Sequence, residues 1–266
     1  MRIFLLACLA LLCLSAPAQA EKLTVFVSIL PQKYFLEKVG GEHLQARVMV
    51  APDASPATYE PKPRQMAELS KAAIYFAIGV PFEKAWLPRF ASASDNLRVI
   101  PSQQGIKKYP LAAHSHGGQH VHEKHHEHAE HDEHGQHHEN EKHHEHAENH
   151  DHKHEHGILD PHVWLSPPLA KQIAANMRKA LAEANPEHAA DYNANLEAFH
   201  KECDELNASL EEMLAPLEPP HNAFMVFHPS WGYFARAYGL RQIAIEIQGK
   251  EPSPAQLQKL IEQAKE

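Results

Sequence analysis

The sequence predicts an α/β fold with parallel sheets, interrupted by a histidine-rich segment and a long helical region. Short β-rich runs alternate with helical stretches between residues 23 and 100, and the alternation restarts after Pro219-Pro220. Such alternation is typical of parallel sheets, whose ligands bind at the loops that follow the strands. Regular apolar spacing after residue 190 predicts one long helix between the two α/β parts.

Residues 1–20 have the features of a secretory signal peptide. Arg2 supplies a positive charge, residues 3–14 form an apolar run, and Ala18-Gln19-Ala20 is a small-x-small cleavage site. The apolar run is too short to span a bilayer core of about 30 Å, which disfavours a retained anchor helix. We therefore expect a periplasmic mature protein that begins at Glu21. Its one remaining cysteine, Cys203, cannot form an internal disulfide.

Residues 21–113 are expected to form an N-terminal α/β lobe. Strands are predicted at 23–30, 46–50, 73–79 and 97–100. Helices are predicted from Gln32 to the Gly40-Gly41 pair, at 64–71 and at 82–90. The segment at 51–63 is rich in proline and alanine and is expected to be a loop.

Residues 114–157 break this pattern and are expected to be a disordered metal-binding loop. They hold 18 of the 24 histidines, 11 acidic residues and three lysines, with almost no apolar side chain. Their net charge of −8 accounts for most of the −9 of the chain, so no basic surface suggests nucleic acid as a partner. An unstructured segment of this length is too long for an ordinary loop.

Residues 158–218 are predicted to be helical. One helix is expected at 167–184, and a second of about 30 residues carries a 3–4 spaced apolar seam. The seam consists of Tyr192, Leu196, Phe199, Cys203, Leu206, Leu210, Met213 and Leu217. We expect this helix to pack along both halves of the protein, with Cys203 as a core residue, in preference to a free coiled coil.

Residues 219–266 are predicted to form a C-terminal α/β lobe. Strands are expected at 223–227 and 242–247, and helices at 230–238 and 253–265. The segment is short for a self-sufficient α/β lobe, so we expect this lobe to continue beyond Glu266.

The histidines predict binding of a transition metal. Neutral imidazole is a good ligand for Zn²⁺, Cu²⁺ and Ni²⁺, whereas Ca²⁺ and Mg²⁺ prefer oxygen. Two clusters of the loop place several imidazoles within one or two residues: His125, His126 and His128, and His143, His144 and His146. The alternatives are a solubilising tract and an affinity tag, although a tag would be terminal and nearly pure histidine.

Two isolated histidines are candidates for a folded metal site. His162 lies at the entrance to the helical region, and His228 directly follows a predicted strand. Histidine at the carboxyl end of an α/β strand faces the region where ligands bind. Taken singly, each histidine would more often be structural, and that role is expected for His43, His188, His200 and His221.

Three segments resemble the cluster A-I substrate-binding proteins of ABC transporters. Residues 160–167 (DPHVWLSP) resemble that family's DPHxWLSP signature, and residues 227–240 resemble its second histidine motif. Residues 59–63 (YEPKP) match the tail of its first motif. A histidine-rich insert between the first and second motifs is typical of the zinc-specific, ZnuA-like branch.

The resemblance implies two Rossmann-like lobes joined by a long rigid backbone helix, with one zinc ion between the lobes. His162 and His228 would be imidazole ligands. Ala57 stands where the family has its first histidine, and the family's usual acidic ligand comes from a C-terminal strand that this sequence does not contain. Glu60 is a further candidate ligand, and the histidine-rich loop is the more natural donor for an empty position.

The sequence therefore predicts a monomeric binding protein that captures Zn²⁺ outside the cytoplasm and delivers it to an ABC transporter permease. A stand-alone periplasmic zinc buffer or metallochaperone is the alternative. A secreted zinc hydrolase has less support, because Gly-x-Ser-x-Gly does not occur and no general base is evident beside the histidines. We expect no enzymatic activity.

Overall fold

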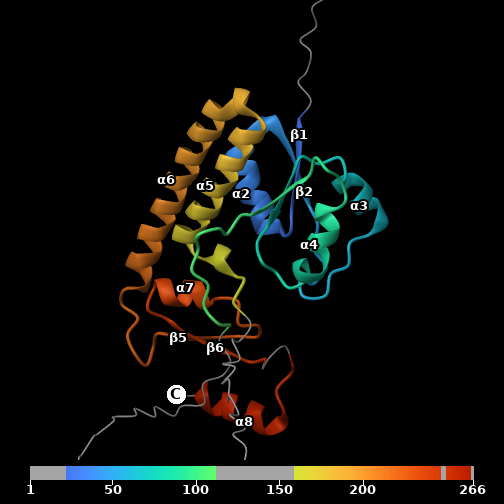
Figure 1. The fold of residues 1–266 in the computed structure, drawn as a ribbon. Helices are drawn as coiled ribbons and strands as arrows, with labels where there is room; N and C mark the ends of the chain where they lie inside the picture. Colours follow the sequence, from blue (N-terminus) through green and yellow to red (C-terminus); the bar gives the residue numbers. More distant parts are fainter. Residues whose placement is uncertain (1–21, 112–158, 247–249, 265–266) are drawn as a thin grey trace, which may run out of the picture.

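The computed structural model describes residues 22–111, 159–246 and 250–264. The predicted signal peptide and the predicted metal-binding loop lie outside the described residues. Within them the chain forms two α/β units connected by a pair of long helices (Figure 1). None of the described helices is both long enough and apolar enough to cross a membrane.

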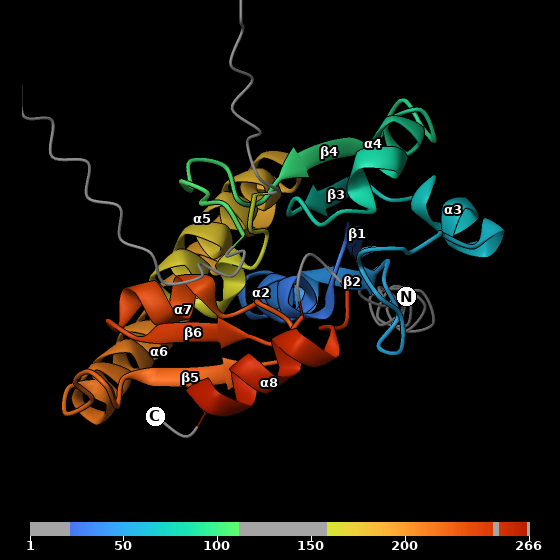
Figure 2. The ribbon, with the colours of Figure 1, turned by 90° about the horizontal axis from the view of Figure 1, so that it is seen from below.

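The N-terminal unit contains a four-stranded parallel sheet in the order β2-β1-β3-β4. Its strands are β1 (Leu23–Val27), β2 (Leu44–Val48), β3 (Ile74–Ala77) and β4 (Arg98–Pro101). Its helices are α2 (Leu30–Gly40), α3 (Pro63–Leu69) and α4 (Glu83–Ala91). All four residues of β3 are buried, because helices cover both faces of the sheet (Figures 1 and 2). The alternation predicted for this lobe is confirmed, with boundaries shifted by a few residues.

Two antiparallel helices follow, α5 (Pro167–Ala184) and α6 (Ala189–Leu214), separated by the 3₁₀ turn Pro186–His188. Figure 1 shows α5 and α6 against α2 on one side of the N-terminal sheet. Ile173, Met177 and Leu181 of α5 are fully buried at this contact. The predicted long helix is therefore confirmed, although it ends at Leu214.

The apolar seam of α6 is buried only over its first half. Tyr192, Leu196, Phe199 and Cys203 are buried, whereas Leu206 and Met213 are 53% and 66% exposed. The second half of the seam is more exposed than the first, because α2 and α5 cover only the first half, although the second half of α6 does contact the C-terminal unit. Burial raises the pKa of the Cys203 thiol to about 11, which agrees with its predicted role as a core residue.

The C-terminal unit contains two parallel strands, β5 (Ala223–Val226) and β6 (Arg241–Ala244). They lie between α7 (Gly232–Ala237) and α8 (Pro254–Gln263) (Figure 1). The hydroxyl of Tyr238, at the end of α7, donates a hydrogen bond of 2.9 Å to Asn207 of α6. This contact joins the unit to the lower half of the long helix.

A buried carboxylate fixes the loops at the carboxyl edge of the N-terminal sheet. Glu83 accepts hydrogen bonds from the backbone N–H groups of Ile78 (2.9 Å) and Gly79 (2.7 Å), just beyond β3. It also accepts a hydrogen bond from the Ser28 hydroxyl, just beyond β1. Burial raises the pKa of Glu83, while these three hydrogen bonds oppose that rise. The carboxylate therefore connects two strand ends.

We expect Glu83→Ala to destabilise the protein by about 2–4 kcal/mol, because it leaves buried N–H groups without an acceptor. Urea unfolding followed by circular dichroism measures the change. Glu205→Ala is the matched control, since Glu205 is 67% exposed on α6 and should change stability by less than about 0.5 kcal/mol. Equal stability of the two variants would contradict the role assigned to Glu83.

Candidate metal centre

The two isolated histidines that the sequence singled out lie side by side in the structure. His162 precedes the 3₁₀ turn Val163–Leu165, and His228 follows β5 by two residues. Their ring centroids are 5.2 Å apart, with the ring planes at 71°. Residues 66 positions apart thus bring two imidazoles to one place. The His162 side chain is 14% exposed and that of His228 is 48% exposed.

Asp160 holds His162 from its own segment. An Asp160 carboxylate oxygen lies 2.6 Å from Nδ1 of His162, and the same oxygen accepts the His162 backbone N–H at 2.9 Å. The Asp160 side chain is only 5% exposed. With the Nδ1 proton donated to this carboxylate, the lone pair of the neutral ring is on Nε2.

Glu246 holds His228 in the same way. A Glu246 carboxylate oxygen lies 2.7 Å from Nδ1 of His228, and the Glu246 side chain is 13% exposed. The backbone N–H of Glu246 donates to the Phe227 carbonyl at 2.9 Å, which extends the β5–β6 pairing past the strand ends. The pairing places the carboxylate and the imidazole at one edge of the sheet.

Glu246 was missed by the sequence reasoning, which placed it inside a strand predicted at 242–247. The strand ends at Ala244, so Glu246 belongs to the turn at the carboxyl edge of the sheet. One signal could have revealed Glu246. It lies two positions after β6, as His228 lies two positions after the parallel strand β5.

This pairing is the arrangement that metal-binding histidines use. A carboxylate on Nδ1 fixes the tautomer and the ring orientation, and it makes Nε2 a stronger donor. Both histidines have such a carboxylate, so two oriented Nε2 atoms are available to a cation. Two imidazoles with acidic partners suit Zn²⁺ and related transition metals better than Ca²⁺ or Mg²⁺.

The backbone around Asp160 is fixed by three further contacts. The Tyr233 hydroxyl of α7 donates to the Asp160 carbonyl at 3.0 Å and accepts the Tyr109 N–H at 3.2 Å. The Asp160 N–H donates to the Tyr109 carbonyl at 2.8 Å. A Cβ added at Gly232 would lie 2.8 Å from an Asp160 carboxylate oxygen, so only glycine allows this approach. Asp160 therefore connects the N-terminal unit, the His162 turn and α7.

The two chain ends that flank residues 112–158 meet beside Asp160. Pro110 and Leu159 form an isolated antiparallel bridge. The predicted metal-binding residues His125, His126, His128, His143, His144 and His146 lie outside the described residues. The described residues on either side of that segment therefore lie close to Asp160.

Glu60 is not brought to the histidines by any contact among the described residues. It is exposed, as is Ala57, on the loop between β2 and α3. That loop is anchored through Tyr59, whose hydroxyl donates to Gln65 at 2.7 Å. Its role as a ligand stays a prediction.

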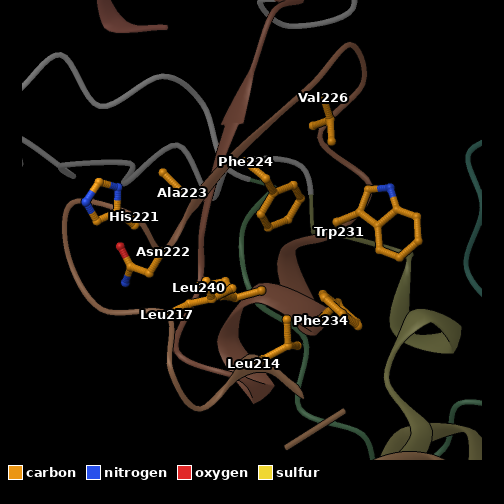
Figure 3. Close-up of a pocket in the computed structure, with 10 residues that line it drawn as sticks. All are labelled: Leu214, Leu217, His221, Asn222, Ala223, Phe224, Val226, Trp231, Phe234 and Leu240. Carbon is orange, nitrogen blue, oxygen red and sulfur yellow. The ribbon is translucent and has the colours of Figure 1, made fainter. Parts of the chain in front are cut away.

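A separate apolar pocket of about 450 Å³ lies between the end of α6 and the C-terminal strands (Figure 3). Its lining is mostly aliphatic and aromatic and includes one imidazole, that of His221. Neither His162 nor His228 lines it. The pocket is therefore distinct from the metal centre.

The chain is similar to metal-binding proteins over most of its length. A metal-binding protein of Treponema pallidum is 29% identical over 266 residues, which cover 95% of this chain and 72% of that protein. A high-affinity zinc uptake system protein ZnuA of Brucella abortus is 33% identical over 112 residues, 41% of this chain and 33% of that protein. The matched region thus spans only a third of the Brucella protein.

Solved structures agree with the fold. A crystal structure of ZnuA superposes with a TM-score of 0.72 and 39% identity, covering 92% of this chain and 78% of that one. Two α/β units joined by a long helix, as predicted, are therefore confirmed. The sequence profile of the family described as "Zinc-uptake complex component A periplasmic" matches residues 25–266, and the chain belongs to this family.

Proposed function

We propose that this protein captures Zn²⁺ outside the cytoplasm, between His162 and His228, and delivers it to the permease of an ABC transporter. One observation carries the proposal: the two imidazoles come from distant segments and lie with ring centroids 5.2 Å apart, each Nδ1 held by a carboxylate. The Brucella relative is named for zinc uptake, and a ZnuA deletion mutant has a solved structure described as zinc-bound. Export through a signal peptide cleaved after Ala20 belongs to the same proposal.

The site would release its cargo as well as bind it. Zn²⁺ in structural sites takes four protein ligands, whereas open sites keep a position for water or another donor. Two imidazoles leave positions that Glu246, Glu60 or water could occupy. His228 is 48% exposed, so the ion would stay accessible from one side. An open coordination sphere suits a carrier that passes its ion to a membrane partner.

The histidine-rich segment would collect ions for this site. Its net charge of −8 attracts cations, and the described residues on either side of it, Pro110 and Leu159, pair next to Asp160. An unstructured chain of 44 residues would have an end-to-end reach of roughly 35 Å. The segment could therefore present an imidazole to the site at the position where Ala57 offers none.

A stand-alone zinc buffer or metallochaperone is the second candidate. Ala57 favours it, because a side chain without a donor atom stands where the resemblance expects a histidine ligand. The two functions differ in whether the zinc-loaded protein binds a permease. Zinc-dependent binding to the permease encoded in the same genome supports delivery, and its absence supports the buffer.

Replacing both His162 and His228 should abolish the tightest zinc site. We expect His162→Ala/His228→Ala, in a chain that lacks residues 114–157, to lose that site in a competition titration against a chromophoric chelator. The matched control is His200→Ala/His221→Ala in the same background, which should keep it. An unchanged zinc affinity of the first double variant would show that His162 and His228 are structural.

The carboxylate that orients His162 should matter without binding metal itself. We expect Asp160→Asn to weaken tight zinc binding by about 10–100-fold, because the amide lacks the charge that strengthens the imidazole. Asp204→Asn on α6 is the control, since the Asp204 side chain is 63% exposed and forms a salt bridge with Lys171, away from both histidines. Equal affinities of the two variants would exclude this role for Asp160.

Deleting residues 114–157 should reduce the number of zinc ions bound per chain while barely changing the metal-free fold. We expect the melting temperature of the metal-free protein to stay within about 2–4 °C, because the segment has too little apolar content to join a core. Calorimetry and zinc titration measure the two quantities. A large loss of metal-free stability would mean that the segment packs against the lobes.

A further inference from the structure

A second group of side chains that could hold a metal ion lies away from His162 and His228. It consists of His43, at the end of the 3₁₀ turn Gly41–His43, His188, at the end of the turn Pro186–His188, and Asp191 in the first turn of α6. One ligand atom from each residue lies within 4.8 Å of the others. This is the only such group of three among the described ranges 22–111, 159–246 and 250–264.

The local fold brings these residues together before any metal arrives. Gly41 ends α2 with a φ of 57°, a left-handed conformation that favours glycine, and so turns the chain towards His43. The imidazole rings of His43 and His188 are stacked, with centroids 3.7 Å apart and planes at 12°. Both rings pack edge-on against Tyr192, which is fully buried.

The spacing of the donor atoms is close to what a tetrahedral ion needs. Metal–nitrogen bonds of about 2.0–2.1 Å at tetrahedral angles separate two ligand atoms by about 3.3 Å. Oδ2 of Asp191 lies 2.8 Å from Nε2 of His43 and 3.9 Å from Nδ1 of His188. These distances bracket the required value. The lone pairs of imidazole lie in the ring plane, so the two stacked rings must rotate apart to direct both nitrogens at one ion.

A further carboxylate adds to the negative potential at this place. Glu187 lies 3.6 Å from Nε2 of His188, and the side chains of Glu187 and Asp191 are 71% and 59% exposed. The two imidazoles are more sheltered, at 19% and 25%. Sheltered nitrogen donors beneath exposed carboxylates form a site that a hydrated cation can enter from solvent.

His43, His188 and Asp191 lie away from His162 and His228. His43 directly precedes Leu44, the first residue of β2, so it is at the amino edge of the N-terminal sheet. The His162–His228 pair lies next to β5 and β6, at the opposite end of the molecule from the α5–α6 junction (Figure 1). The proposed cargo site therefore makes no use of His43, His188 or Asp191.

We propose that His43, His188 and Asp191 form a second site for a transition-metal ion of the zinc class, with water completing the coordination. An ion held there connects the end of α2 to the start of α6. It would stabilise the metal-bound N-terminal unit without contributing to transport. The same three groups could act instead as a hydrogen-bonded tie between His43 and Asp191, with no metal.

Histidine footprinting on the full-length mature chain separates these alternatives. Carbethoxylation with diethyl pyrocarbonate, read by peptide mass spectrometry, reports each imidazole individually. With zinc in molar excess over all 24 histidines, the reaction rates of His43 and His188 should fall together by about tenfold, as expected at 90% occupancy. Rates at these two residues that do not change with zinc would overturn the proposal.

Two variants test the ligand set. Asp191→Asn should remove the zinc protection of His43 and His188, because an amide is a poor substitute for an anionic ligand. Asp204→Asn, on the same helix, should leave that protection intact. Full protection in Asp191→Asn would overturn the three-residue site.

The same digests keep this test independent of the cargo site. Protection of His162 and His228 measures zinc binding at the proposed cargo site. The reaction rates of His200 and His221 measure general changes in accessibility. If zinc protects His43 and His188 but not His162 and His228, the result would contradict the proposed function and support the second site. A zinc-edge anomalous peak bonded to His43 and His188 would locate the ion directly, and a peak elsewhere with none at this group would refute the site.

Discussion

Asp160 is the residue on which the metal centre depends, because it contacts three parts of the fold at once. Its carboxylate orients His162, its backbone pairs with Tyr109 of the N-terminal unit, and its carbonyl accepts the Tyr233 hydroxyl of α7. Gly232 lets the start of α7 approach the same carboxylate. The position of the His162 ring is therefore constrained by hydrogen bonds within the fold. Such preorganisation lowers the cost of binding a ligand.

The second carboxylate, Glu246, gives His228 the same kind of partner on Nδ1 that Asp160 gives His162. Each ring donates from Nδ1 to an acidic partner that is at least half-buried, and each keeps Nε2 for a cation. One histidine–carboxylate pair comes from the segment before α5 and the other from the carboxyl edge of the β5–β6 sheet. The second position agrees with the general rule that α/β proteins bind ligands beyond the carboxyl ends of their strands.

Much of the fold could be predicted from the sequence, because strands such as 23–27 and 74–77 are short runs rich in apolar, β-branched and aromatic residues. His162 and His228 could be found because each lies in a motif at a strand or helix end. Glu246 could not, since its importance depends on where β6 ends and on pairing with β5. The exposed half of the α6 seam was also beyond prediction, because spacing shows that residues share a face but not what covers it. His43 and His188 are 145 positions apart, and no local pattern joins them.

The most direct test of the central claim is a crystal structure of the zinc-loaded chain lacking residues 114–157, with diffraction measured on both sides of the zinc absorption edge. An anomalous peak about 2.0–2.1 Å from Nε2 of both His162 and His228, with Asp160 and Glu246 still on Nδ1, is the predicted result. A fully loaded protein with no zinc bonded to either of these imidazoles would contradict the account.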